Sequence, residues 1–372
     1  MRTRLLGFAL ASLAALAGCG SSGTGTLNVR LVDGPGDFLE INLHVLRVEI
    51  HGTSGGWRTL ATPDTKVNLL TLRDGVSATL VDGATVPAGT YTQMRLVLGH
   101  DNTVMLPDET LHDLKVPSGQ QSGVKLTVNF TVEPNTTKDV FIDLDGAHSI
   151  MLHTAGASEQ YILRPVVRAV DRLATGAILG RLTDASSAAG LPGVVVTAQA
   201  VDGGGDASVV RSAVTGPDGS YVLDLLPVDG TYHVVSQPVV GTTAFVARAS
   251  GGIPISPATP TPRWDAAFTA TDRVGRLTGG VTPASDSDGD VVSARQGLDA
   301  GGTPRTLVVR TTVPSVASGV ESYAMELLPA GDYRVDVVRR SVDGDGDETI
   351  TRSAPVSATV PAGGSAVANL AL

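Results

Sequence analysis

Histidines are the side chains of this chain that are best able to bind a metal or move a proton. Six of the seven are His44, His51, His100, His112, His148 and His153. A metal site needs three or four converging ligands, and two ligands on one strand should be spaced i, i+2. None of these pairs has that spacing, and no thiol lies among them. The pattern therefore favours surface or half-buried histidines over a metal site.

Alternating carboxylates form two runs, Asp286–Asp290 and Asp343–Glu348. Such runs suit a hard cation such as Ca²⁺, but an EF-hand requires glycine straight after its third acid. Val291 follows the first run, and Glu348 follows Asp347 in the second. Two interpretations stay open, a less regular calcium loop and a solvated acidic turn, and the mismatch favours the turn. We expect no cofactor.

Motifs that would support catalysis are weak in this sequence. It holds no His-Glu-x-x-His motif and no phosphate-binding loop, so we predict that the protein is not an enzyme. Carbohydrate binding is the alternative, because sugar sites stack pyranose rings on exposed aromatics. Trp57 follows Gly55-Gly56 and Trp264 follows Thr-Pro-Thr-Pro-Arg, so either could lie at a loop tip. These two tryptophans are the candidate ligand-binding residues, although core packing is the default for both.

The composition predicts an all-β protein. The chain has 372 residues, of which 42% are hydrophobic and 17% charged, a balance typical of chains that bury cores. Its 44 glycines and 21 prolines separate runs rich in Val, Thr and Leu, as in short strands joined by tight turns. The formal net charge is −10, and losing Arg2 and Arg4 with a leader would make it −12. We therefore expect no binding to nucleic acid or anionic lipid.

The first residues predict an export signal. Arg2 and Arg4 give a positive start, and an almost uninterrupted apolar or small run of 14 residues extends from Leu5 to Gly18. As a helix that run would be about 21 Å long, too short for a hydrocarbon core of about 30 Å. It is therefore predicted to be a signal segment and not a membrane span.

Leu16-Ala17-Gly18-Cys19 resembles the lipobox of bacterial lipoproteins, and Cys19 is the only cysteine in the chain. The resemblance implies a diacylglyceryl group on the Cys19 thiol, cleavage between Gly18 and Cys19, and acylation of the new amino group. In that family's sorting pattern Asp after the cysteine favours the inner membrane, so Gly20 points to the outer membrane. Residues 21–25 then predict a short flexible tether.

A repeated phrase divides the remaining chain. Ser220–Val235 (SYVLDLLPVDGTYHVV) and Ser322–Val337 (SYAMELLPAGDYRVDV) match, with their first tyrosines 102 residues apart, and a shorter echo begins at Val86. Alternating apolar residues, a Pro-x-Gly-type turn and a second tyrosine predict strand, turn and strand. The tyrosine hydroxyls are expected to reach nearby backbone. The letters Gly-Arg-Leu-Thr, which begin at Gly180 and at Gly275, suggest that the two blocks also start alike.

The second block resembles the carboxypeptidase regulatory-like, transthyretin-type β-sandwich family. The matching segments are 180–184, 190–198, 217–221 and 226–232. That family's domain is a non-catalytic module beside other domains. The third block shares the tyrosine phrase but lacks a clear Gly-x-Pro-x-Gly segment, so it is predicted to be a divergent copy.

The first block resembles the family of domain of unknown function 4382, which occurs at the front of bacterial lipoproteins. The matching segments are 31–37, 45–52, 86–96, 117–126, 143–150 and 161–165. The resemblance implies a β-sandwich without assigned catalytic residues. Within it, the strand after Asp37 changes parity between Val45 and Leu46, which predicts a β-bulge.

The sequence thus predicts three tandem β-sandwich (Ig-like or transthyretin-like) domains after a cleaved lipoprotein signal peptide. The expected segments are 1–18 (signal), 19–25 (lipidated cysteine and tether), 26–173, 174–272 and 273–372. We expect a non-catalytic cell-envelope protein that acts as a binding or structural module, with a carbohydrate-binding surface lipoprotein as the alternative. Its expected partners are the membrane, through the lipid, and envelope proteins or polysaccharide.

Overall fold

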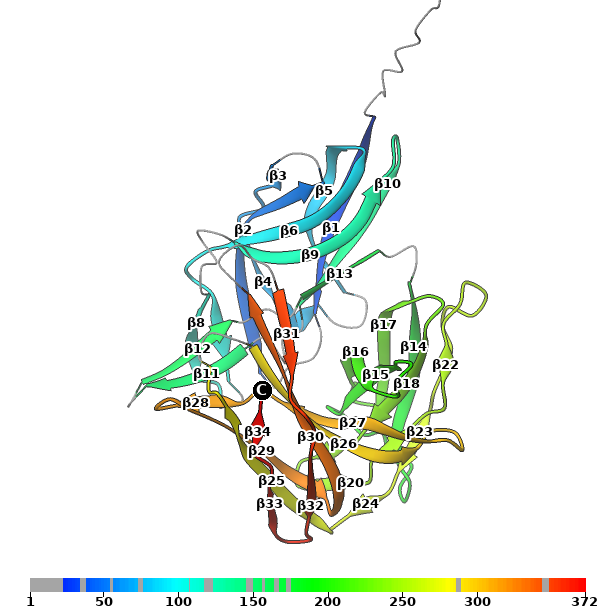
Figure 1. Ribbon diagram of the computed structural model, residues 1–372. Coiled ribbons are helices and arrows are strands. Elements are labelled where there is room, and N and C mark those ends of the chain that lie inside the picture. The colour runs from blue at the N-terminus through cyan, green and yellow to red at the C-terminus, as the bar shows by residue number, and fades with distance from the viewer. Residues whose placement is uncertain are drawn as a thin grey trace, which may run out of the picture.

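The protein consists of strands arranged in three modules (Figure 1). The computed structural model describes residues 23–33, 38–53, 56–72, 76–106, 108–116, 123–144, 150–155, 158–163, 167–171, 175–285, 289–342 and 348–372. Within these residues the one helical element is a single turn of 3-10 helix. The all-β prediction is therefore confirmed.

Module one begins with β1 and ends with β13. Its elements are β1 (Thr24–Asp33), β2 (Glu40–Gly52), β3 (Arg58–Ala61), β4 (Thr65–Asn68), η1 (Leu69–Thr71), β5 (Ala78–Pro87), β6 (Gly89–Leu98), β7 (Thr103–Met105), β8 (Leu111–Lys115), β9 (Val124–Val132), β10 (Thr137–Leu144), β11 (Ile150–Ala155), β12 (Ser158–Leu163) and β13 (Val167–Asp171). One sheet has the order β13-β10-β1-β5. In the facing sheet β2 pairs with β3, β4, β6 and β7, and β9 pairs with β6.

The core of module one lies between these two sheets. Leu27, Val29 and Leu31 alternate along β1 and are fully buried. The parity change predicted in β2 is present, since its register against β6 shifts between Val45 and Arg47. Two residues of β2 oppose one of its partner there, as in a β-bulge. The bulge allows β2 to keep apolar residues inward at both ends while its other side chains face outward.

Module two contains strands β14 to β24. They are β14 (Thr175–Asp184), β15 (Val195–Val201), β16 (Ala207–Val214), β17 (Ser220–Pro227), β18 (Thr231–Ser236), β19 (Val239–Val240), β20 (Thr243–Phe245), β21 (Arg248–Ala249), β22 (Ile253–Pro254), β23 (Ala266–Phe268) and β24 (Ala270–Thr271). The sheet β17-β14-β23 packs against the sheet β16-β15-β18-β21, with Phe268 and Leu223 fully buried between them.

Module three contains strands β25 to β34. They are β25 (Val274–Thr282), β26 (Gly289–Asp299), β27 (Pro304–Thr312), β28 (Ser315–Ala317), β29 (Val320–Pro329), β30 (Gly331–Val342), β31 (Glu348–Arg352), β32 (Val356–Val360), β33 (Ser365–Val367) and β34 (Leu370–Ala371). The strands β33-β25-β29-β28 form one layer and β27-β26-β30-β31 the other.

The second tyrosine of the repeated phrase makes the same kind of hydrogen bond in all three modules. The hydroxyl of Tyr232 donates a hydrogen bond to the carbonyl oxygen of Pro227 at 2.9 Å, and Tyr333 does the same to Pro329 at 2.6 Å. In module one Tyr91 donates to the Pro87 oxygen at 2.7 Å. The prediction that these tyrosine hydroxyls reach nearby backbone is confirmed. The short echo at Val86 therefore shares the tyrosine-to-proline hydrogen bond of the phrase.

The match between modules two and three extends to the backbone. Leu225 and Leu327, at equal places in the phrase, both have a left-handed φ, 52° and 55°. Gly180 lies opposite Tyr221, and Gly279 lies opposite Tyr323. Gly180 of module two and Gly279 of module three are therefore structurally equivalent.

The shared letters Gly-Arg-Leu-Thr do not mark equivalent positions. Gly275, the first of the second set, pairs with Leu328, whereas Gly176 pairs with the matching Leu226. The position in module two that corresponds to Gly275 is therefore Gly176 and not Gly180. Both glycines precede a register shift, and backbone oxygens approach closely enough to exclude a Cβ at each.

The turn at Gly216–Ser220 joins strands of two different sheets. Its backbone is tight, since the Gly219 N–H donates to the Gly216 oxygen at 2.9 Å and the φ of Gly219 is 83°. The strands that it joins, β16 and β17, belong to different sheets. The turn therefore carries the chain across the sandwich.

The modules pack directly against one another and are not separated by extended linkers. Arg211 of module two is buried and forms ion pairs with Asp143 of module one and with Asp224. Val32 and Phe141 of module one form a small buried cluster with Leu225. Module one therefore meets module two through both charge and apolar packing.

Modules two and three share a larger interface. The amide of Gln199 hydrogen-bonds both the nitrogen and the oxygen of Val308, and Arg295 donates to the Ala207 oxygen at 2.6 Å. Val235 is buried in the core of module three. Side chains of module two thus form part of the core of module three.

Module three also touches module one. Strand β28 pairs with β29 of its own module and, in parallel, with β11 of module one. One continuous sheet therefore extends from β33 to β9 (Figure 1). Each module consequently contacts both others.

Candidate functional site

The outer face of β2 carries several polar and charged side chains. Ile41 and Leu43 are fully buried, so the alternating Asn42 and His44 face away from the core. Beyond the bulge, the outward positions of β2 hold Arg47, Glu49 and His51. Two clusters form on this face, one around His44 and one around Glu49.

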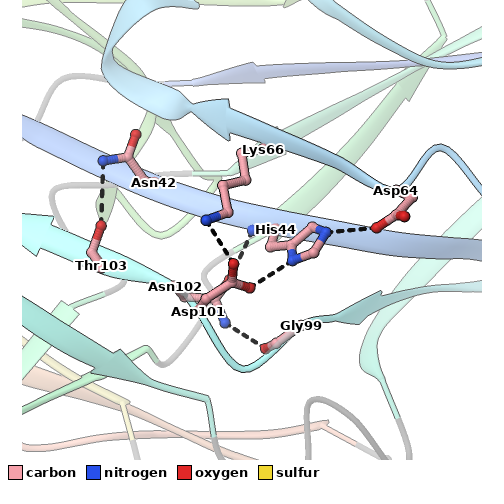
Figure 2. A network of polar contacts seen from close by, with 8 residues as sticks. All are labelled: Asn42, His44, Asp64, Lys66, Gly99, Asp101, Asn102 and Thr103. Carbon is pink, nitrogen blue, oxygen red and sulfur yellow. Dashed lines mark hydrogen bonds and ion pairs between the residues drawn. The ribbon is translucent and has the colours of Figure 1, made fainter.

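His44 is held between two carboxylates (Figure 2). Its Nδ1 lies 2.6 Å from Oδ1 of Asp101, and its Nε2 lies 2.7 Å from Oδ1 of Asp64. Lys66 on β4 places its Nζ 2.6 Å from the other oxygen of Asp101. His44 is half-buried, whereas Asp64 and Asp101 are largely exposed. A rim of alternating charges therefore links β2, β4 and the loop after β6.

These contacts set the charge of the cluster. The hydrogen bond to Asp101, and next the one to Asp64, raise the pKa of His44 above its ordinary value of 6.5. Lys66 and His44 hold the pKa of the Asp101 carboxyl well below its usual range. A doubly hydrogen-bonded imidazolium has no nitrogen left to accept a proton, so His44 is unsuited to act as a general base in this arrangement.

The loop after β6 is fixed against β2 by backbone contacts. Buried Asn102 accepts a hydrogen bond from the His44 N–H at 2.8 Å and donates to the Gly99 oxygen at 2.7 Å. A Cβ on Gly99 would lie 2.6 Å from Nδ1 of His44, so only glycine allows this close approach. The loop therefore presents Asp101 to the imidazole in a defined position.

The second cluster surrounds Glu49. Its carboxylate accepts hydrogen bonds from Nε of Arg47 at 2.6 Å and from Arg95. Burial alone would raise the pKa of Glu49, but the hydrogen bonds from Arg95 and Arg47 outweigh it and hold the pKa below its ordinary value. Arg95 also lies over the ring of Trp57, with Cζ 4.3 Å from the ring centroid. The cluster is thus an ion pair capped by a cation–π contact.

The two candidate tryptophans have different environments. Trp57 is half-buried, one ring face is covered by Arg95, and the ring of His51 lies 5.5 Å away. Trp264 packs against the core of module two, and its backbone oxygen accepts a hydrogen bond from Tyr221. The equivalent acceptor in module three is Ala368, whose oxygen binds Tyr323. Trp264 therefore occupies a structural position, and Trp57 lies on the polar face of β2.

The histidines are dispersed. His51 contacts Trp57, His112 lies 4.8 Å from the Tyr161 ring, and His100 is exposed. His148 and the side chain of His153 lie outside the described residues. Among the side chains that the structure describes, no three His, Cys, Asp or Glu residues converge as metal ligands. At His44 the two carboxylates contact opposite ring nitrogens, so they do not converge on one ion.

The acidic run at Asp286–Asp290 is described only in part. Residues 286–288 lie outside the described residues, as do 343–347 of the second run. Asp290 is buried and forms two hydrogen bonds with Arg339, at 2.8 and 2.7 Å. Asp290 is therefore neither a solvated acid nor a calcium ligand, because both of its carboxylate oxygens bind Arg339 inside the protein.

Glu321 is the second carboxylate on that arginine. Arg339 donates to its Oε2 at 3.1 Å, and its Oε1 receives no hydrogen bond. Burial, and next the charge of Asp290, raise the pKa of Glu321 to about 8. A protonated Glu321 can donate its hydrogen to Asp290. No sequence motif predicts this cluster of Asp290, Glu321 and Arg339, which joins strands β26, β29 and β30.

The segment Gly52-Thr53-Ser54-Gly55-Gly56 has the letters of a Gly-x-Ser-x-Gly nucleophile elbow. That motif requires a turn from a strand into a helix. Here the segment joins the antiparallel strands β2 and β3, and Ser54 lies outside the described residues. The match therefore lacks the backbone context of a hydrolase.

The predicted anchoring residues, Gly18 and Cys19, lie outside the described residues. In the described part of the chain, no helix has the length and apolarity needed to cross a bilayer. The lipidation of Cys19 stays a prediction.

Comparison with known families identifies part of module one. Residues 24–165 match the family model described as Domain of unknown function (DUF4382). The predicted resemblance of the first block is therefore confirmed, whereas the carboxypeptidase regulatory-like resemblance of the second stays a prediction. No curated protein matches the chain.

Solved structures give only distant likenesses. The Bacillus anthracis TIE protein is 12% identical with a TM-score of 0.20, over 94% of this chain and 50% of that one, so this chain spans about half its length. The Streptococcal ancillary pilin is 12% identical with a TM-score of 0.23, over 93% of this chain and 98% of that one. A putative adhesin from Bacteroides ovatus is 10% identical with a TM-score of 0.18, over 49% and 83%. At these TM-scores the likeness supports no inference about function.

Proposed function

We propose that this protein is a non-catalytic module of the cell envelope, held to a membrane by lipid on Cys19. Its three docked β-sandwiches would act as one stiff binding or structural element. The observation that carries the proposal is the docking itself. Arg211 and Gln199 are buried polar side chains whose partners, Asp143 and Val308, lie in neighbouring modules.

Buried polar contacts of this kind favour a fixed arrangement. Interfaces between domains of one chain are commonly small and permit relative motion. Separating these modules would remove Asp143 from buried Arg211 and leave the backbone of Val308 without the Gln199 amide at the moment of opening, which is costly. A body of fixed shape suits a spacer or a presenting platform better than a flexible string does.

The polar face of β2 also fits a role without catalysis. His44 is held at both nitrogens, and Glu49 is held by two arginines. In both clusters the charged groups satisfy one another. Such clusters stabilise a surface or bind a partner, and they offer no activated nucleophile.

Membrane attachment is tested by metabolic labelling. Cells that make the wild type or Cys19→Ala would be given a fatty-acid analogue, and the protein would be recovered and assayed for label. We expect label in the wild type only, with the wild type in the outer-membrane fraction because Gly20 follows the cysteine. Equal labelling of both proteins would refute the anchor. Cross-linking on intact cells would then distinguish envelope-protein partners from polysaccharide.

A second candidate function is carbohydrate binding near Trp57. The observation that favours it is the half-buried Trp57 ring next to Arg95 on the outer face of module one. Aromatic rings flanked by hydrogen-bond donors are suited to sugars. On a glycan array, Trp57→Ala should lose any binding that the wild type has. Trp264→Ala serves as the matched control, since Trp264 packs on a core, and loss of binding in both variants alike would point to misfolding.

A further inference from the structure

The first strand of the protein begins between two turns at one end of module one. The turn after β5 donates a hydrogen bond from the Ala88 N–H to the Gly23 oxygen at 2.7 Å. The turn after β9 donates one from the Asn135 N–H to the Thr24 oxygen at 2.8 Å. From there β1 pairs with β5 on one side and with β10 on the other. The chain therefore enters module one at a fixed place between these two turns.

The start of β1 and the two turns form one surface, which we call the β1 end and define as residues 23–24, 87–90 and 133–136. It lies at one extremity of module one, and modules two and three lie toward the opposite extremity (Figure 1). Because the three modules pack into one body, the orientation of the β1 end determines which way the whole protein points.

The proposed site of lipid attachment is close to the β1 end in sequence. Cys19 lies four residues before Gly23, and four residues span at most about 14 Å when fully extended. Strand β1 has ten residues and is about 33 Å long. The tether is thus shorter than half of this one strand. A lipid on Cys19 would therefore keep the β1 end near the bilayer surface and let β1 lead away from it.

The exposed groups of the β1 end fit the headgroups of zwitterionic lipids. Within residues 87–90 and 133–136, Glu133 is the one charged side chain, and the others are proline, alanine, glycine, threonine and asparagine. The exposed Glu133 carboxylate can accept hydrogen bonds from the ammonium group of phosphatidylethanolamine. The exposed Asn135 amide can donate to a lipid phosphate. The net charge of −10 makes anionic lipids a poorer partner.

A short tether makes weak contacts of this kind effective. It holds the β1 end at a high effective concentration next to the headgroups, in the millimolar range for short linkers. We propose that the β1 end is the membrane-contacting surface of the protein, which lies against zwitterionic headgroups and directs modules two and three away from the bilayer. This inference rests on the lipid anchor proposed for Cys19. It places the turn between β32 and β33 on the side far from the membrane (Figure 1).

Quenching of a fluorophore by labelled lipid tests this orientation. The acylated full chain would be purified from the cells that make it and added to preformed vesicles of phosphatidylethanolamine and phosphatidylcholine, with a nitroxide on some phosphatidylcholine headgroups. Acylated Cys19 holds its sulfur as a thioether, so a thiol-reactive fluorophore labels only an introduced cysteine. Glu133→Cys should lose most of its fluorescence in these vesicles. The matched control Ala362→Cys, in the exposed turn after β32, should lose none relative to vesicles without nitroxide.

Three additions keep the test decisive. Ala88→Cys carries the label in the other turn and should be quenched in the same way if Glu133→Cys does not fold. A water-soluble nitroxide added without vesicles should quench the labels at Glu133→Cys and Ala362→Cys alike, since both positions are exposed. Insertion of about 20 Gly and Ser residues between Ser22 and Gly23 adds a root-mean-square reach of about 25 Å. It should reduce the quenching at Glu133→Cys.

The outcomes separate this inference from the anchor on which it rests. If the wild type fails to float with vesicles in a density gradient, the anchor is refuted and the inference with it. Flotation with equal quenching at Glu133→Cys and Ala362→Cys, or with stronger quenching at Ala362→Cys, overturns the orientation and leaves the anchor intact. Unchanged quenching after the insertion overturns the part given to the short tether.

Discussion

The side chain of Gln199 pairs with the backbone of Val308 as a neighbouring strand would. The two residues are 109 positions apart, and the amide uses both its donor and its acceptor on one peptide position of an edge strand. Edge strands expose N–H and C=O groups that invite unwanted pairing. Here a side chain of module two occupies that position on β27. The interface between modules two and three therefore has the hydrogen-bond pattern of a sheet.

Gln199→Ala should weaken this interface specifically. The substitution leaves the Val308 N–H and C=O without partners, at a cost of about 1–3 kcal/mol for each buried group that water does not reach. We expect the urea concentration at the midpoint of unfolding to be lower for the variant than for wild type. Modules two and three should then unfold in separate transitions. The matched control Gln160→Ala changes an exposed glutamine of β12 and should leave the midpoint unchanged. Identical curves for the two variants would contradict the role given to Gln199.

Glu321 should make stability fall as pH rises. Its pKa is raised from 4.5 to about 8, so the folded state holds a proton that the unfolded state releases. The stabilisation from this proton is complete below the unfolded pKa and is lost as pH rises through the folded pKa, that is, between about pH 4.5 and 8. Glu321→Gln imitates the protonated form, so its Tm relative to wild type should rise between pH 5 and pH 9, by about 5 °C in order of magnitude.

The control for that experiment lies on the same strand. Glu326 is exposed and pairs with Arg276 on the outer surface of β29. Glu326→Gln should shift Tm equally at both pH values. If Glu321→Gln gave the same flat difference, the buried carboxyl would not be protonated in the folded state.

His44 should stabilise module one most at mildly acidic pH. Because Asp101 and Asp64 raise its pKa, its contribution is complete below about pH 6.5 and is lost as pH rises through the folded pKa. His44→Gln should therefore lower Tm relative to wild type at pH 5.5, and the gap should close at pH 9. His100→Gln, at an exposed position of the adjoining loop, is the control and should show no such gap. An NMR titration of the His44 ring with a midpoint below 6.5 would refute the two-carboxylate clasp.

The tyrosine-to-proline hydrogen bond should contribute similarly in each module. Tyr333→Phe and Tyr232→Phe each remove one hydroxyl and leave a proline carbonyl without its donor. A loss of about 1 kcal/mol in the free energy of unfolding is expected for each, measured by urea denaturation. Tyr91→Phe should cost the same in module one. Wild-type stability in all three variants would mean that water replaces the hydroxyl.

Local features of the fold could be predicted from sequence because their causes are local. The phrase around Tyr232 and Tyr333 contains its own alternation, turn and hydroxyl donor, and it folds as predicted. The parity change after Val45 similarly predicts the bulge in β2. At Gly275 the matching sequence predicted the wrong equivalent residue in module two. The true equivalent is identified by the residue that Gly275 pairs with on the next strand, and not by its sequence neighbours.

The candidate site and the interfaces depend on partners that are distant in sequence. His44 meets Asp64 and Asp101, 20 and 57 positions away, in two different loops. Asp290 belongs to an acidic run that predicts exposure, yet Arg339 on a neighbouring strand keeps it inside. Such distant side chains are brought together by the register of the strands that carry them. The hydrophobic periodicity of the sequence does not determine that register between distant segments.

Strand β28 joins the last module directly to the first. It pairs with β29 on one side and with β11 on the other, so modules three and one share a ladder of hydrogen bonds. A tensile force applied to module three would enter module one through this ladder without first passing along module two. The order in which the modules bear load therefore differs from their order along the chain.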